Sequence, residues 1–195
     1  MRLNIHNSSK SNHTIFDRFK RKDFFFEEFE NNFFFKPFLD SNYFKKLNYK
    51  KLVNNKNRVH VFGMGGSSLS SKLLIQFLNT KDLNSKIFIY DNPYDELIEK
   101  NLSQYKITNN DKFIFISKSG KTAETKYFLE YIEKYLAKIG LKKSKKNFIF
   151  ITENTNNFLN NYGKKNNIIC FEHDPNIGGR FSIFSITGLL PLLLI

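Results

Sequence analysis

The chain has 195 residues, of which 31 are Lys or Arg and 18 are Asp or Glu, giving a net charge of +13. Hydrophobic residues make up 41% of the chain, enough for a folded core, which excludes a fully disordered protein. A single cysteine excludes an internal disulfide framework, and no apolar run reaches the roughly 18 to 20 residues that span a bilayer. Residues 1–22 contain no apolar signal core. We therefore expect a soluble cytoplasmic protein with no membrane partner.

The positive charge has two explanations. Lys, Asn, Phe and Ile dominate the sequence and have A+T-rich codons, so genome composition can produce the excess of lysine. A nucleic-acid-binding protein would gather its basic residues on one face or stripe. Here they are scattered, with short groups only at Arg18–Lys22 and Lys142–Lys146. Composition is therefore favoured over a nucleic-acid partner.

Residues 1–57 differ from the rest of the chain and are predicted to form a helical or irregular N-terminal segment. They are polar and aromatic, with seven phenylalanines between Phe24 and Phe35. The spacing predicts a helix over Asp23–Asn32 that packs one side against a larger body. A membrane-surface helix is the alternative, but the glutamates Glu27, Glu28 and Glu30 would repel anionic headgroups.

Residues 58–195 alternate short apolar runs with helix-length segments, which predicts a single α/β domain. The predicted strands are Arg58–Gly63, Lys86–Tyr90, Lys112–Ser117, Asn147–Thr152 and Asn167–Phe171. The predicted helices are Ser68–Leu78, Tyr94–Tyr105 (capped by Asn92 with Pro93 in the first turn), Thr122–Gly140 and Thr155–Tyr162. Strands that are apolar nearly throughout are typical of parallel sheets buried on both faces. The order predicts a doubly wound, three-layer αβα fold with about five parallel strands.

The last segment, Phe181–Ile195, is apolar almost all round, which predicts a buried helix. Because the sequence stops inside this run, we expect the chain to be the N-terminal part of a longer protein.

Three loops at the carboxyl ends of the strands are the candidate sites, because ligands of parallel α/β sheets bind there. The first, Gly63 to Ser68, combines glycines with a helix start. Gly63, Gly65 and Asp91 fit a dinucleotide site, but Ser68 replaces the third glycine. A plain tight turn is the alternative.

The second loop, Ser117 to Thr125, carries three hydroxyl residues at the start of a helix. Gly120-Lys121-Thr122 resembles the end of a P-loop, but Phe115 stands where a P-loop needs glycine. Ser117, Ser119 and Thr122 are suited to a phosphate monoester, whose dianion accepts several hydrogen bonds. The alternative is an ordinary Ser/Thr helix cap.

The third loop places Gly178 and Gly179 before Arg180, so the backbone passes close to another group and then presents a fixed cation. A planar guanidinium is suited to stabilising an oxyanion, although a structural arginine is an equal alternative. We expect His173 to be a surface or hydrogen-bonded loop residue and Cys170 to be a buried apolar filler. No residues have metal-ligand spacing.

All three loops resemble one family. Gly63-Met64-Gly65-Gly66-Ser67-Ser68-Leu69 resembles its turn G-I-G-G-S-x-L, Ser117 to Thr125 its phosphate loop S-K-S/T-x-x-T-x-E-T, and Gly178 to Ser182 its signature G-G-R-F/Y-S. The family is glucose-6-phosphate isomerase (phosphoglucose isomerase), and residues 58–195 would be its first sugar isomerase (SIS) domain. Ser70 and Lys121 depart from the family pattern.

The resemblance implies roles for particular residues. Gly66 and Ser67 would contact the sugar, Ser117, Lys118, Ser119, Gly120, Lys121 and Thr122 would bind the phosphate, and Arg180 would stabilise an enediolate. It implies no metal or organic cofactor, a sugar-phosphate substrate and a homodimer. The catalytic base, histidine and lysine would follow Ile195 together with a second SIS domain, so this chain alone would be inactive. The alternatives are another SIS-domain sugar-phosphate isomerase, a phosphosugar-sensing protein and, more distantly, a dinucleotide-binding oxidoreductase.

Overall fold

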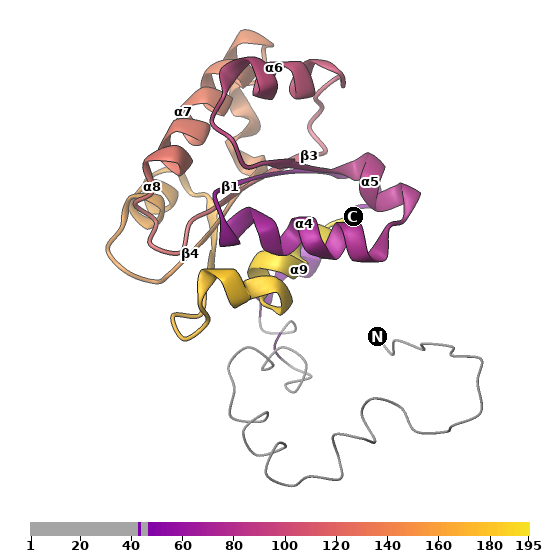
Figure 1. The fold of residues 1–195 in the computed structure, drawn as a ribbon. Coiled ribbons are helices and arrows are strands. Elements are labelled where there is room, and N and C mark those ends of the chain that lie inside the picture. Colours follow the sequence, from indigo (N-terminus) through magenta and orange to yellow (C-terminus); the bar gives the residue numbers. More distant parts are fainter. Residues whose placement is uncertain (1–42, 44–46) are drawn as a thin grey trace, which may run out of the picture.

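Five parallel strands form one sheet in the order β2-β1-β3-β4-β5 in the computed structural model, which describes residue 43 and residues 47–195 (Figure 1). The strands are β1 (Arg58–Gly63), β2 (Ile87–Tyr90), β3 (Asp111–Ile116), β4 (Phe148–Thr152) and β5 (Ile169–Glu172). The predicted five-stranded α/β fold is therefore confirmed, with each strand within two residues of its expected bounds. The helix expected over Asp23–Asn32 lies outside the described residues.

Aromatic and aliphatic side chains occupy opposite faces of this sheet. Along β3, Phe113 and Phe115 face one way while Ile114 and Ile116 face the other, and β4 repeats the pattern. The period-two alternation of a strand produces this separation. On the aromatic face, the ring of Phe62 stacks at 4.5 Å on Tyr90 and at 5.0 Å on Phe115, measured between ring centroids. The sheet therefore presents two chemically different surfaces to its covering helices.

Each face has its own set of helices (Figure 1). The aromatic face packs against α6 (Asp95–Ser103), α7 (Ala123–Lys138) and α8 (Phe158–Asn166). The aliphatic face packs against α4 (Gly66–Leu78) and α9 (Ile186–Leu193). Short elements complete the described chain: α5 (Lys81–Lys86) and the 3-10 helices η2 (Tyr49–Leu52), η3 (Lys142–Asn147) and η4 (Gly179–Phe184). Within the described residues, no helix is long and apolar enough to cross a bilayer.

Several predicted helix ends need correction. Helix α6 begins at Asp95 with Tyr94 as its N-cap, so Asn92 and Pro93 lie before it. Helix α8 begins at Phe158, because the Asn157 side chain accepts the N–H of Asn160 and caps the helix there. The predicted stop of α7 at Gly140 is confirmed: this glycine has φ 81° and its N–H donates to Ala137 O.

The apolar C-terminal segment is not one buried helix. It divides at Ser185, whose backbone is extended and whose hydroxyl accepts the N–H of Thr187 to start α9. Phe181, in η4, is 61% exposed. The expectation of an uninterrupted, fully buried helix over Phe181–Ile195 was therefore wrong.

Strand β5 lies at the edge of the sheet and is exposed at three of its four residues. Cys170 is among them, so this residue is exposed and is not the buried filler that was expected. The expectation took all five strands to be buried on both faces, but an edge strand has a neighbour on one side only.

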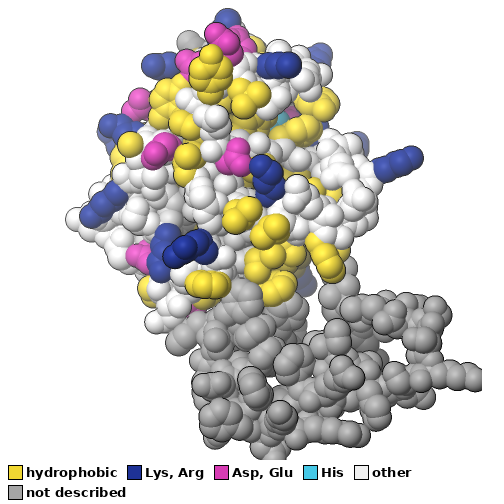
Figure 2. All heavy atoms as spheres, in the orientation of Figure 1, with side chains coloured by type: hydrophobic (Ala, Val, Ile, Leu, Met, Phe, Trp, Pro, Cys, Tyr) yellow, Lys and Arg dark blue, Asp and Glu magenta, His cyan; other side chains and the backbone are white. Residues whose placement is uncertain are grey.

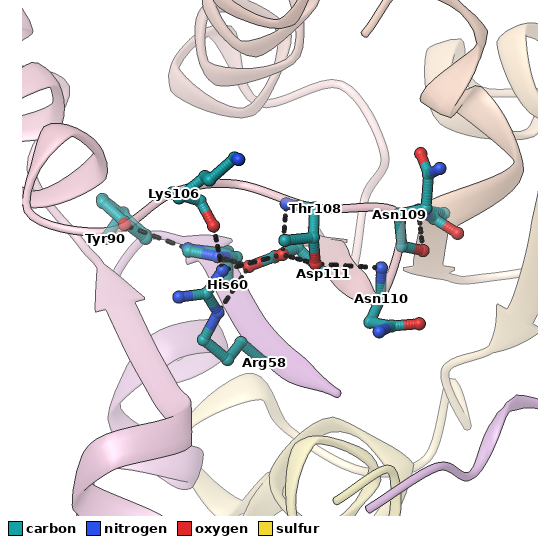
Figure 3. Close-up of polar contacts among 9 residues, drawn as sticks. Arg58, His60, Tyr90, Lys106, Thr108, Asn109, Asn110 and Asp111 are labelled. Atoms are coloured by element: carbon teal, nitrogen blue, oxygen red, sulfur yellow. Dashed lines mark hydrogen bonds and ion pairs between the residues drawn. The ribbon is translucent and has the colours of Figure 1, made fainter. Parts of the chain in front are cut away.

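The amino-terminal edge of the sheet holds a buried polar cluster (Figure 3). The Asp111 carboxylate accepts hydrogen bonds from Arg58 Nε at 3.0 Å and from the Thr108 N–H at 2.7 Å. His60 Nε2 lies 3.1 Å from Asp111 Oδ1, and its Nδ1 lies 3.1 Å from the Tyr90 hydroxyl. Because a carboxylate only accepts, Nε2 carries the proton and Nδ1 accepts from Tyr90. The His60 ring also stacks at 5.1 Å on Phe88, so this histidine belongs to the aromatic face.

Helix α4 packs unusually closely on η4 and α9. A Cβ atom added at Gly66 would lie 2.4 Å from the carbonyl carbon of Gly179, and the Ser70 and Ser182 hydroxyl oxygens are 2.9 Å apart. Ser71 Oγ donates to the carbonyl of Thr187 at 3.1 Å. Small side chains at this contact allow the backbones to approach.

The outer side of α4 is apolar. Leu69, Leu73 and Phe77 recur every four residues along it and are 45%, 44% and 81% exposed. Figure 2 shows hydrophobic side chains gathered on the face of the molecule that carries α4. This helix is therefore apolar on two sides, one toward the sheet and one outward.

The Asp111 cluster predicts a specific acid sensitivity. Burial alone would raise the pKa of Asp111, but hydrogen bonds from His60, Arg58 and Thr108 outweigh burial and lower the pKa to about 2. Since the unfolded pKa is higher, the stabilisation is present above about pH 4 and is lost as the pH falls toward 2. Urea unfolding between pH 5 and pH 2 should show wild type losing up to about 2 kcal/mol more than Asp111→Asn. Asp95→Asn, at an exposed carboxylate, is the control, and parallel curves for wild type and Asp111→Asn would contradict the prediction.

The contact between α4 and η4 predicts opposite outcomes for two Gly→Ala substitutions. Alanine at Gly66 would press on the backbone of Gly179 and Arg180, which should reduce the free energy of unfolding by about 1–3 kcal/mol. A Cβ at Gly179 meets no atom within 4 Å, so Gly179→Ala should change it by less than about 0.5 kcal/mol. Urea unfolding of both variants measures this, and equal losses would mean that the close approach has no energetic weight.

Candidate functional site

The three candidate loops meet at the carboxyl edge of the sheet, after β1, β3 and β5. The turn between β1 and α4 has Gly65 with φ 55°, a left-handed conformation that favours glycine. Gly66 then lies against the backbone of Gly179 and Arg180. The first and third loops are therefore in direct contact; the glycines of the third loop predicted a close approach but not the group that it approaches.

The second loop is built around a pair of hydroxyl groups. Ser117 Oγ and Thr122 Oγ1 lie 2.6 Å apart, and the N–H of Gly120 donates to Ser117 Oγ at 3.1 Å. Ser119 is exposed, and its hydroxyl accepts the N–H of Lys121 at 3.3 Å. Two of the three hydroxyls predicted for this loop therefore lie side by side, and the third, on Ser119, bonds the loop's own backbone.

Helix α7 begins directly after this loop without a side-chain cap. Thr122 occupies the N-cap position, but its hydroxyl is bonded to Ser117 and not to a first-turn N–H. The ordinary helix-cap alternative predicted the opposite. First-turn N–H groups that have no capping side chain can bind an anion instead.

Lys118 connects three loops through its ammonium group. Nζ donates to the carbonyls of Pro175 at 2.9 Å and Ile177 at 3.0 Å and lies 3.4 Å from Glu153 Oε1. The side chain therefore extends toward the loops that follow β4 and β5. The backbone of Lys118 is therefore part of the hydroxyl loop, while its ammonium group binds the carbonyls of the loop that precedes Arg180.

Two candidate cations remain available at this edge. Arg180 and Lys121 are exposed, and within the described part of the chain neither side chain makes a hydrogen bond or an ion pair. Ser67 is half-buried, and its hydroxyl likewise has no hydrogen bond to a described residue. A ligand at this edge would meet hydroxyl donors, helix N–H groups and two unpaired positive charges.

Other residues singled out in the sequence lie elsewhere. Asp91, the dinucleotide candidate, forms a 3.1 Å ion pair with Lys72 on the surface. His173 is buried with Nδ1 2.9 Å from Asp174 O, which confirms a hydrogen-bonded loop histidine, and burial lowers its pKa. A hollow of about 520 Å³ beside β5 includes Cys170 and shares Thr152 with the surroundings of the hydroxyl loop. Within the described residues, no three His, Cys, Asp or Glu side chains form a group that could hold a metal ion.

Sequence reasoning missed Asn157, which lies beneath the hydroxyl loop. It is 2% exposed, and its Oδ1 lies 2.1 Å from where a Cβ of Gly120 would stand. In the sequence it is one of several asparagines in a polar stretch, so only the fold distinguishes it. The only sequence signal was the glycine at position 120; the structure gives it φ 63° and places Asn157 against it.

Comparisons with known proteins give a consistent family. The family model "Phosphoglucose isomerase" matches residues 39–195, beginning ahead of residue 58. Proteins named glucose-6-phosphate isomerase from Campylobacter jejuni and Methanocaldococcus jannaschii are 38% and 35% identical over 70% and 77% of this chain. These alignments cover 33% and 36% of the two relatives, so the chain spans about a third of their length.

The fold has a similar counterpart among solved structures. A hypothetical protein from Thermus thermophilus superposes with a TM-score of 0.63 at 22% identity, over 91% of this chain and 45% of that one. At this identity the likeness concerns the fold alone. Since the family model matches most of the sequence and its three motifs meet at one edge of the sheet, the chain belongs to the phosphoglucose isomerase family.

Proposed function

We propose that this chain carries the phosphate-binding and sugar-binding part of an isomerase that interconverts glucose 6-phosphate and fructose 6-phosphate. The observation that carries the proposal is the hydroxyl loop, in which Ser117 and Thr122 pair at 2.6 Å in front of an uncapped helix. Family membership and the names of the relatives supply the substrate. The isomerase activity of the whole protein is likewise proposed.

The hydroxyl loop is suited to a phosphate dianion. Ser117 Oγ accepts the N–H of Gly120, and one of the Ser117 and Thr122 hydroxyls donates to the other. A phosphate oxygen in front of α7 would accept the hydrogen bond that these two hydroxyls now share. Ser119 and Lys121 stand exposed on the same loop, and Lys121 adds positive charge. Hydrogen bonds to a charged acceptor are stronger than those between neutral groups.

Arg180 is suited to the enediolate that forms between C1 and C2. Its backbone is fixed against Gly66, while its guanidinium is exposed and unpaired among the described residues. A cation held in place before the reaction stabilises negative charge as it develops. Gly66 and Ser67, at the same junction, would contact the sugar.

The remaining parts of the function stay expectations. The family resemblance assigns the base, the ring-opening groups, a homodimer and a cytoplasmic location, and it implies no cofactor. A second candidate is another sugar-phosphate isomerase or a phosphosugar-sensing protein, since a hydroxyl loop of this kind would recognise the phosphate of any of these sugars. The dinucleotide alternative is weaker because Asp91, its ribose partner, is paired with Lys72.

Removing the hydroxyl pair should weaken sugar-phosphate binding. Each hydrogen bond to a charged group contributes about 1.5–3 kcal/mol, so Ser117→Ala with Thr122→Ala should raise the Kd for fructose 6-phosphate by well over tenfold. Isothermal titration of the chain measures this, with Ser103→Ala, an exposed serine on α6, as the control. Equal affinities for the double variant and wild type would reject the phosphate site.

Arg180→Lys should weaken binding at the reacting carbon atoms of the sugar more than binding of the phosphate. Lysine keeps the charge but loses the planar fork. The variant should lose at least about tenfold in affinity for an aldonic acid 5-phosphate, whose carboxylate imitates the enediolate. Affinity for the matching alditol phosphate, which is neutral at that position, should change by less than about threefold. Equal losses for both compounds would make Arg180 a phosphate ligand or a structural residue.

A further inference from the structure

The close contact between Gly120 and Asn157 joins the hydroxyl loop to the segment between β4 and α8. A Cβ at Gly120 would lie 2.1 Å from Asn157 Oδ1 and 2.6 Å from Thr152 Oγ1. Gly120 is buried and has φ 63°, a conformation that favours glycine. The hydroxyl loop can therefore approach the β4–α8 segment this closely only because position 120 has no side chain. The Asn157 side chain fills the space directly beneath Gly120.

Asn157 is itself fixed from every side. Its Oδ1 accepts the N–H of Asn160 at 2.9 Å. Its amide nitrogen lies within 3.1 Å of Thr152 Oγ1, Glu153 O and Thr155 Oγ1. With 2% exposure, the side chain has no freedom to rotate away from Gly120.

Hydrogen bonds connect the fixed Asn157 side chain and its neighbours to the backbone of the hydroxyl loop. Thr152 Oγ1, which accepts from Asn157, donates to Lys118 O at 3.2 Å, and Glu153 N–H donates to the same carbonyl at 3.0 Å. Leu159 N–H donates to Gly120 O at 3.3 Å. Two carbonyls of the loop are thus held toward the β4–α8 segment.

Holding these carbonyls also sets the direction of two N–H groups. In a planar trans peptide the C=O of one residue and the N–H of the next point in opposite directions. The N–H groups of Ser119 and Lys121 are therefore turned away from the β4–α8 segment, and that of Lys121 donates to the Ser119 hydroxyl at 3.3 Å.

We propose that Asn157 is a positioning residue that holds the hydroxyl loop in its anion-binding conformation, acting through Gly120 and Thr152 without touching the ligand. The inference rests on the proposed function, in which this loop binds a phosphate. It adds a residue from another loop that determines affinity for the sugar phosphate.

The test compares two asparagines of the same segment. Asn157→Ser keeps a helix-capping hydroxyl but removes the support beneath Gly120 and the bond to Thr152. Asn160→Ser is the matched control, because it loses two side-chain bonds in the same segment, to Glu153 O and Thr155 O, and leaves the Gly120 contact intact. Thermal unfolding establishes that both variants fold, and isothermal titration gives their affinities for fructose 6-phosphate and inorganic phosphate.

Asn157→Ser should weaken both probes by roughly tenfold, the loss expected when one hydrogen bond to a charged group is misaligned. Asn160→Ser should stay within about twofold of wild type. Unchanged binding by Asn157→Ser, or an equal loss in Asn160→Ser, overturns the inference and leaves the proposed function standing. Absence of fructose 6-phosphate binding by wild type overturns both.

A second pair of variants decides the matter if Asn157→Ser does not fold. Thr152→Val is isosteric but cannot donate to Lys118 O, whereas Thr152→Ser keeps that hydroxyl. The valine variant should lose roughly tenfold in affinity for both probes, and the serine variant should bind as wild type does. Equal binding by the two Thr152 variants would overturn the positioning role.

Discussion

The structure depends on the alternation of aromatic and β-branched side chains along adjacent parallel strands. Because β3 and β4 both alternate Phe with Ile, their rings fall on one face and their branched aliphatic side chains on the other. Phe62 of β1 then stacks on Tyr90 and Phe115, whereas the rings of β3 and β4 meet edge to face. Any shift of register by one residue would exchange the two faces. The register therefore also fixes which loops emerge together at the carboxyl edge.

The candidate site is held together by contacts between loops more than within them. Gly66 meets the backbone before Arg180, the Lys118 ammonium bonds the carbonyls of Pro175 and Ile177, and Asn157 lies under Gly120. Each contact ties a loop of one strand to a loop of another. The Ser67 hydroxyl and the Lys121 and Arg180 cations can then remain without partners among the described residues, since other residues of the same loops supply the rigidity.

The fold could be predicted from the sequence because its signals are local. Apolar runs of β-formers gave the strands, and Gly140 marked the end of α7, where its φ of 81° is needed. The break at Ser185 was not predicted. A run of apolar residues predicts burial but not where a helix is interrupted, and a single serine can lie within a helix as well as cap one. Cys170 was misplaced because a strand's apolar sequence does not say whether it has one neighbour or two.

The site could be predicted in part for the same reason. Motif resemblance selected the loops, and their meeting at one edge follows from a parallel sheet. The direction of the Lys118 side chain could not be predicted, since a long flexible chain is directed by acceptors 57 and 59 residues away. Asn157 was missed because its role comes from a tertiary contact with Gly120. The roles of the loop residues stay predictions.

The division of the sheet into a ring face and an aliphatic face also limits how this sequence can drift. Codons for phenylalanine and isoleucine differ by a single base and are both rich in A and T, so one base change can exchange the two residues without altering the A+T content. At Phe115 that exchange would leave a gap among stacked rings, and at Ile114 the reverse would force a ring against α4 and α9. A drift in base composition can therefore change the Lys-rich and Asn-rich exterior of this protein, while one interior face keeps its aromatic residues and the other keeps its aliphatic residues.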